Sequence, residues 1–160
     1  MSNGDTRTAS VWPCVGYYTL AMVALTITLG IGLVAIPSLS KDVIRAAGFS
    51  INYGSTKVAS YKFIKRNGRL FSREEYWIIV LLSTLAACLI SAIQGWLALV
   101  GGTAPQNLSN VPVAVWVGSS LFAFLLVFGL NAAGYSGRFG RDVLKAELAR
   151  RARIDTETFR

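Results

Sequence analysis

Three long runs of residues without a charged side chain dominate the pattern of this chain. They extend from Val11 to Ile36, from Tyr76 to Gly102 and from Val111 to Tyr135. A helix needs about 20 mainly apolar residues to cross the roughly 30 Å hydrocarbon core of a bilayer, and each run is long enough. The pattern therefore predicts an all-α integral membrane protein with three strong transmembrane helices. Their expected bounds are about 11–36, 72–101 and 111–135.

The start of the second run carries a helix-capping signal. Ser72 and Glu75 have the spacing of a capping box, in which each side chain accepts a hydrogen bond from the backbone N–H of the other residue. Just before it, the pair Asn67-Gly68 is typical of a helix end, because glycine adopts a positive φ without steric cost. The sequence therefore predicts one helix that ends near Arg66, a tight turn, and a second helix from Ser72.

The segment between the first two runs is ambiguous. Residues 43–66 are rich in small side chains and mildly apolar, but they include Arg45 and Lys57. As a helix, Ala46 to Ser60 would cover only about 22 Å at 1.5 Å per residue, so basic side chains at its ends would have to extend to the membrane surface. The segment is either a short, weaker second transmembrane helix, which makes four in total, or a linker.

The distribution of basic residues mildly favours three spans. With three spans, Arg7 lies outside and the other 15 of the 16 basic residues lie inside. With four spans, 13 basic residues lie inside with the N-terminus, Lys41 and Arg45 lie outside, and Lys57 lies in the membrane. Cytoplasmic segments carry an excess of lysine and arginine, so both arrangements place the C-terminal tail in the cytoplasm.

The segment KFIKRNGR at residues 62–69 lies between a helix rich in small residues and a helix start with acidic residues. From Gly54 to Ile93 the chain resembles a family of small uncharacterised bacterial inner-membrane proteins, catalogued under an Acinetobacter locus tag and expected to have four spans. The family more often has a Pro-Thr pair where this chain has Phe71-Ser72. The resemblance implies a short second span that ends near Lys62 and favours four helices, but it implies no activity.

The tail from 136 to 160 has the composition of an amphipathic helix. It carries seven basic and four acidic residues. Its apolar residues fall near one helical face and are Phe139, Val143, Leu144 and Leu148. We expect a C-terminal helix that either lies on an anionic membrane surface or is solvated in the cytoplasm. The whole chain, 1–160, is expected to form a single membrane domain.

The amino-acid composition is typical of a membrane protein and disfavours catalytic and metal sites that depend on histidine. The 160 residues are 53% apolar and 15% charged, whereas soluble domains contain about 25% charged residues. Histidine is absent, so the commonest general base and zinc ligand are missing. We expect no catalytic, cofactor-binding or metal-binding residues and no cofactor.

The net charge of +8 is concentrated beside the apolar runs, which indicates contact with anionic lipid headgroups and not with nucleic acid.

Small residues recur at helical spacing within the predicted spans. Such stripes let helix backbones approach each other closely in lipid, either within one bundle or between two copies of a protein. The positions concerned are Gly30 in the first run and Ser83, Ala87, Ser91 and Gly95 in the second.

A set of polar residues is the candidate for a polar or lipid-binding site. A lysine that faces the bundle at membrane depth can bind an anion or a lipid phosphate, whereas one that extends to the surface only anchors its helix. The set consists of Asn52, Lys57, Lys62, Arg66 and Arg69. Gln94 and Asn131 are the amides of the strong spans, and both lie within about two turns of a span end.

These patterns favour a non-enzymatic membrane protein, which would be a structural or accessory subunit, or part of a larger assembly. The alternative is an oligomeric channel, transporter or holin-like pore-former. An enzyme is disfavoured, because no nucleophile and general base stand together in the sequence. The expected location is the bacterial inner membrane, crossed several times, with lipid, a second copy or a membrane complex as partner.

Overall fold

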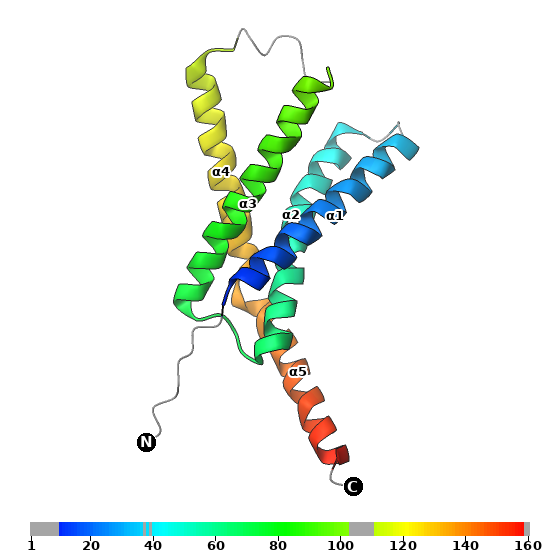
Figure 1. Cartoon of the computed structure of the whole chain (residues 1–160), viewed down its shortest axis with the longest axis vertical. Helices are drawn as coiled ribbons and strands as arrows, with labels where there is room; N and C mark the ends of the chain where they lie inside the picture. Colours follow the sequence, from blue (N-terminus) through cyan, green and yellow to red (C-terminus); the bar gives the residue numbers. More distant parts are fainter. Residues whose placement is uncertain (1–9, 37, 39, 103–110, 159–160) are drawn as a thin grey trace.

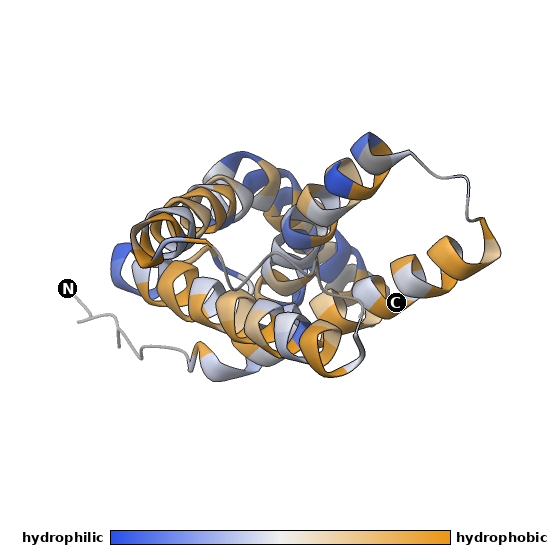
Figure 2. Ribbon diagram, turned by 90° about the horizontal axis from the view of Figure 1, so that it is seen from above, coloured by the Kyte–Doolittle hydropathy of each residue, from blue (hydrophilic) through white to orange (hydrophobic). Residues whose placement is uncertain are grey.

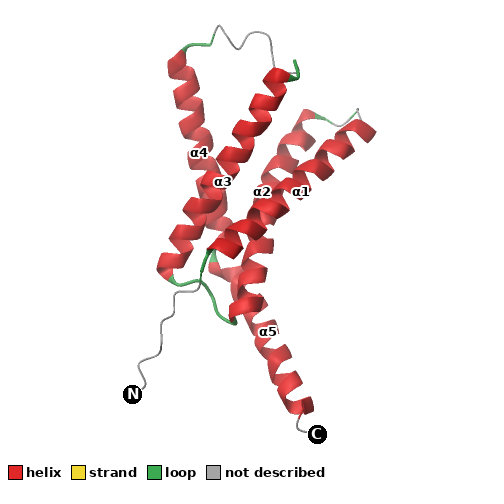
Figure 3. Ribbon diagram, viewed as in Figure 1, coloured by secondary structure: helices red, strands yellow, loops and turns green. Residues whose placement is uncertain are grey.

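The computed structural model describes residues 10–36, 38, 40–102 and 111–158, which form five helices and no strand (Figure 1, Figure 3). The helices are α1 (Trp12–Ala35), α2 (Lys41–Asn67), α3 (Arg73–Val100), α4 (Val113–Tyr135) and α5 (Gly137–Thr158). Three of them are long and apolar enough to cross a membrane: α1, α3 and the helical stretch that begins with α4. The expected all-α membrane fold is confirmed.

The transmembrane helices begin and end within two residues of the positions expected from the sequence. The capping box is present, because Ser72 Oγ accepts from the N–H of Glu75 at 3.2 Å and the Glu75 carboxylate accepts from the N–H of Ser72 at 2.9 Å. Gly68 ends α2 with a φ of 63°, as its position after Asn67 predicts. Of the expected loop at 101–110, residues 103–110 lie outside the described part of the chain.

Two helical hairpins make up the molecule. The α1–α2 hairpin and the α3–α4 hairpin meet at one end and diverge toward the other (Figure 1). We call the first end the closed end; it carries the start of α1, the turn between α2 and α3, and the junction of α4 with α5. We call the other the open end; α1 and α3 finish there, and α2 and α4 begin there. Helix α2 therefore runs antiparallel to α1 and packs along it.

The core lies in the half of the molecule next to the closed end. Buried residues of α1 reach only as far as Met22, those of α3 only as far as Ala87, and those of α4 begin at Asn131. Toward the open end, large apolar side chains such as Val34 and Trp96 are exposed. Side chains that face outward from a membrane protein are covered by lipid, so this exposure is compatible with a membrane location.

Helix α2 is poor in apolar residues in part because much of its buried face is polar or small, with Phe63 and Ile64 as its large buried apolar residues. Asn52, Ser55, Thr56 and Ser60 are all buried in the bundle, and α2 packs against α1, α4 and α5. Neighbouring helices cover this face, so α2 needs less hydrophobic surface than its neighbours do. Figure 2 shows the resulting contrast at the open end, where the hydrophilic start of α2 lies beside the hydrophobic end of α1.

The C-terminal helix α5 uses its apolar face against the bundle. Val143 and Leu144 are partly buried against the core, and α5 packs on α2. At Gly140 of α5, an added Cβ would lie 3.0 Å from Leu70, in the turn after α2, and 3.5 Å from Ile64 of α2, so α5 lies close to the end of α2 here. From the sequence we expected this face to meet a membrane surface or the cytoplasm. Its contact with α2 was not predicted.

Candidate functional site

The candidate polar residues are distributed over four places in the structure. Arg69 lies in the turn before α3 and donates two hydrogen bonds to the buried carboxylate of Glu75, at 2.6 and 2.8 Å. The hydrogen bonds to this carboxylate raise the pKa of Arg69 above its usual value. A buried carboxylate must be paired to remain charged, so Arg69 stabilises the start of α3. It is not free to bind lipid.

Lys57 binds the end of α4. Its ammonium group donates to the carbonyl oxygen of Gly134 at 2.9 Å and lies over the rings of Tyr53 and Phe139, at 4.6 and 4.8 Å from the ring centres. The last carbonyls of a helix have no partner within the helix and carry the negative end of its dipole. Lys57 therefore caps α4, and the two rings shield its charge on either side.

Other side chains complete this cap. Tyr76 of α3 donates to the carbonyl oxygen of Ala132 at 2.8 Å, and Ser136 donates to that of Ala133 at 2.6 Å. Ser136 itself has an extended backbone, which separates α4 from α5. Lys57 thus joins the α1–α2 hairpin to α4 at the closed end, and the hydrogen bonds of Tyr76 and Ser136 hold the end of α4 in place within its own hairpin.

Asn52 belongs to a buried polar cluster between the helices. The hydroxyl of Tyr18 and the side-chain oxygens of Asn52 and Asn131 are buried and have no hydrogen-bond partner within the described chain. The amides of Asn52 and Asn131 both lie within interaction range of the Tyr18 hydroxyl. Asn131 also donates to Thr84 at 3.1 Å. Helices α1, α2, α3 and α4 each contribute one residue to this cluster.

A cleft opens between the two hairpins toward the open end. We call it the hairpin cleft; its volume is about 380 Å³. Leucine, valine, isoleucine, phenylalanine and methionine side chains make up much of its lining. Its polar and small lining residues are Thr26, Arg45, Gly48, Asn52, Ser91 and Gln94. Because Asn52 also belongs to the buried polar cluster, the polar cluster and the cleft are continuous.

The predicted small-residue stripe of α3 divides between the core and this cleft. Ser83 is buried and forms a hydrogen bond of 2.9 Å with the hydroxyl of Tyr135, and Ala87 is buried next to the cleft. Ser91 is exposed and lines the cleft. Gly95 and Gly30 are exposed, and a Cβ added at either would meet nothing within 4 Å. A packing role for these two glycines stays a prediction that concerns a contact outside the chain.

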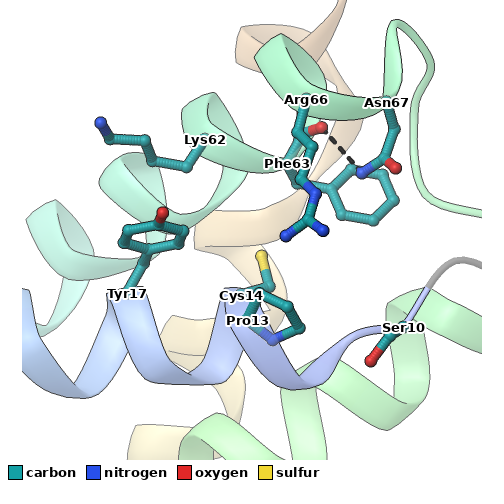
Figure 4. Close-up of a pocket in the computed structure, with 8 residues that line it drawn as sticks. All are labelled: Ser10, Pro13, Cys14, Tyr17, Lys62, Phe63, Arg66 and Asn67. Atoms are coloured by element: carbon teal, nitrogen blue, oxygen red, sulfur yellow. Dashed lines mark hydrogen bonds between the residues drawn. The ribbon is translucent and has the colours of Figure 1, made fainter.

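Lys62 and Arg66 both line a second cavity, at the closed end, and their side chains point in different directions. We call it the basic pocket; its volume is about 170 Å³ and it lies between the start of α1 and the end of α2. Figure 4 shows Arg66 pointing from α2 toward Cys14 and Pro13, and Lys62 extending above Tyr17. The Lys62 ammonium lies 5.6 Å from the centre of the Tyr17 ring.

The closest approach of two helices occurs at a glycine outside the predicted stripes. A Cβ added to Gly134 of α4 would overlap with Thr56 of α2. Gly134 lies outside the predicted stripes, which consist of small residues at four-residue spacing within the long runs. The run of small residues from Ala132 to Gly134 is the signal that could have identified it.

Within the described residues there is no group of three or more histidine, cysteine, aspartate or glutamate side chains that could hold a metal ion. The Cys14 thiol donates to the carbonyl oxygen of Ala59 at 3.2 Å.

No protein-family model, curated protein or solved structure matches this chain. The resemblance over Gly54 to Ile93 therefore stays a prediction, and any function has to be argued from the geometry of the chain itself.

Proposed function

We propose that this chain is a four-span protein of the bacterial inner membrane and acts as a structural or accessory subunit. In this arrangement α2, which has 27 residues and is longer than the short helix expected from the sequence, is the fourth span. Both the start of α1 and the tail α5 lie on the cytoplasmic side. The antiparallel packing of α2 along α1 supports this proposal, since it puts the basic turn at residues 66–73 and the basic α5 at the same end.

The hairpin cleft is the observation that carries the proposal. Within the described residues, the buried residues of α1 and α3 lie in the half near the closed end. The cleft between the hairpins has small residues on both walls, Gly48 on one and Ser91 on the other. Small residues permit close approach of a further helix backbone in lipid. A transmembrane helix of another subunit, laid along this cleft, would complete the packing that the chain leaves open.

Photo-crosslinking at a single position tests this role. A photoreactive phenylalanine analogue is placed at Ser91, which lines the cleft, or at Leu89, which is 63% exposed and does not line the cleft. We expect irradiation of living cells to give one discrete protein adduct from position 91 and none from position 89. Equal adducts at both positions, or none at either, would refute the assembly role.

A second candidate function is supported by the buried polar cluster. Buried polar groups without a partner are unusual and often mark a site for water or a ligand. Asn52 places one such atom in the lining of the cleft, and those of Tyr18 and Asn131 are buried within the bundle. On this basis the chain would be a subunit of an oligomeric channel, transporter or holin-like pore-former. Dye entry into cells upon induction, lost in the Asn131→Leu variant, would favour this candidate over the first.

A further inference from the structure

The basic pocket presents positive charge that the described chain does not neutralise. Lys62 and Arg66 are one turn apart on α2, and neither forms an ion pair within the described residues. By contrast, Arg69 at the same end of the molecule is paired with Glu75. The pocket therefore carries two positive charges that no acidic side chain of the described residues neutralises.

The tail gives a second example of such neutralisation. Arg150 and Arg151 both bind Glu147, at 3.0 and 3.1 Å, and their hydrogen bonds lower the pKa of this carboxyl group. Arg151 also donates to the carbonyl oxygen of Lys65 on the face of α2 that carries α5. The backbone of α2 is thus engaged with α5 on that face, whereas Lys62 and Arg66 line the pocket between α2 and the start of α1.

The start of α1 adds to the positive potential of the pocket. No side chain caps this helix end, its first turn has no acidic residue, and Pro13 occupies its first turn without an N–H to donate. Ser10, Pro13 and Cys14 bring this end of the helix into the wall of the pocket. The amino end of a helix favours an anion because its dipole presents positive charge there. The N–H of Cys14 donates to the carbonyl oxygen of Val11 at 3.0 Å, so the contribution of this helix end is that of its dipole.

The position of the pocket matches the level of lipid headgroups. It lies where the apolar α1 begins, and the aromatic residues Trp12 and Tyr17 at this level are exposed, as is typical of a membrane–water interface. Farther along α1, Leu20 and Ile27 are exposed and offer an apolar surface to acyl chains. A phosphate held in the pocket would therefore have its lipid tails beside the helix.

We propose that the basic pocket binds the phosphate of an anionic phospholipid, with Lys62 and Arg66 as its ligands and the start of α1 as a further source of positive charge. This site is independent of the partner helix proposed above, since it lies at the opposite end of α1. A free phosphate ion has the same chemistry as the headgroup, but only the lipid also uses the exposed apolar side of α1.

Native mass spectrometry of the full chain in detergent tests the site. The protein is titrated with phosphatidylglycerol or with phosphatidylcholine, which has no net charge. We expect wild-type protein to prefer phosphatidylglycerol. The double variant Lys62→Gln, Arg66→Gln should bind this lipid about thirtyfold more weakly, because each basic residue near an anionic headgroup contributes a factor of slightly more than about five to the affinity and the two factors multiply. The charge-conserving variant Lys62→Arg, Arg66→Lys should keep most of the preference, which separates lost binding from lost folding.

Lys65→Gln is the matched control, because Lys65 is on the same helix near the same depth but does not line the pocket. It should bind phosphatidylglycerol as the wild type does. Equal weakening by Lys65→Gln would mean that only net charge matters and would overturn the site. So would an unchanged affinity of the double variant. Displacement of the lipid by low concentrations of inorganic phosphate would show that the pocket binds the free ion and would contradict the proposal that it binds a lipid.

Discussion

At the scale of single residues, the contact of Gly134 with Thr56 decides how closely α4 can approach α2. Both residues are buried, and Lys57, the next residue on α2, caps the carbonyl oxygen of Gly134. The packing contact and the cap therefore depend on the same short distance between the helices. A side chain at 134 would push α4 away and lengthen the hydrogen bond from Lys57.

Replacement of Gly134 by alanine is therefore expected to destabilise the protein, by roughly 1–3 kcal/mol for an overpacked contact. Gly129→Ala is the control, because Gly129 is on the same helix and an added Cβ would meet nothing there. Thermal unfolding in detergent can be followed with a thiol-reactive dye that reaches the buried Cys14 only on unfolding, in a Cys88→Ala background. Equal melting temperatures for the two variants would contradict the contact.

At the scale of helices, hydropathy identified α1, α3 and α4 because most of their side chains face lipid. Helix α2 was ambiguous because neighbouring helices cover its Asn52, Ser55, Thr56 and Ser60. Its sequence therefore lacks the long apolar run by which hydropathy identifies a transmembrane helix. The capping box at Ser72 and the glycine stop at Gly68 were predictable, since both depend on interactions within a few residues.

The candidate site was predictable only in part, for the same reason. Local sequence shows that Lys57, Lys62, Arg66 and Arg69 are basic, but not which carbonyl oxygen or carboxylate each one meets. Lys57 finds its partner 77 residues away in the sequence. Pairing over such a distance is set by the packing of the hairpins, which periodicity alone does not determine.

The proposed insertion of α2 makes a prediction about two positions. Cysteines are introduced singly at Ser38, before α2, and at Arg73, the first residue of α3, after replacement of the native cysteines. If α2 crosses the membrane, a membrane-impermeant thiol reagent should label position 38 in intact spheroplasts and position 73 only after lysis. Labelling of both positions only after lysis would mean that residues 38–73 lie on one side and that the chain has three spans.

At the scale of the whole molecule, the described parts of the two hairpins are joined near one end. The hydrogen bond from Lys57 to Gly134 links the two hairpins near the closed end, and the buried residues of α1, α3 and α4 lie in the same half. From Met22 and Ala87 onward, α1 and α3 have no buried residue in the described chain. The angle between the hairpins therefore depends on the contacts at the closed end and on the lipid or partner helix that occupies the cleft at the open end.

This asymmetry predicts that the distance between the hairpins varies more at the open end than at the closed end. Spin labels at Ile31 and Leu97, exposed residues of α1 and α3, should give a broad distance distribution in nanodiscs without a partner. Labels at Val58 and Ile78, near the closed end, should give a narrow one. A helix bound in the cleft would narrow the first distribution and leave the second unchanged, because the closed end is already fixed by its hydrogen bonds. Equally narrow distributions in the isolated chain would show that lipid alone holds the hairpins apart and that the cleft needs no partner.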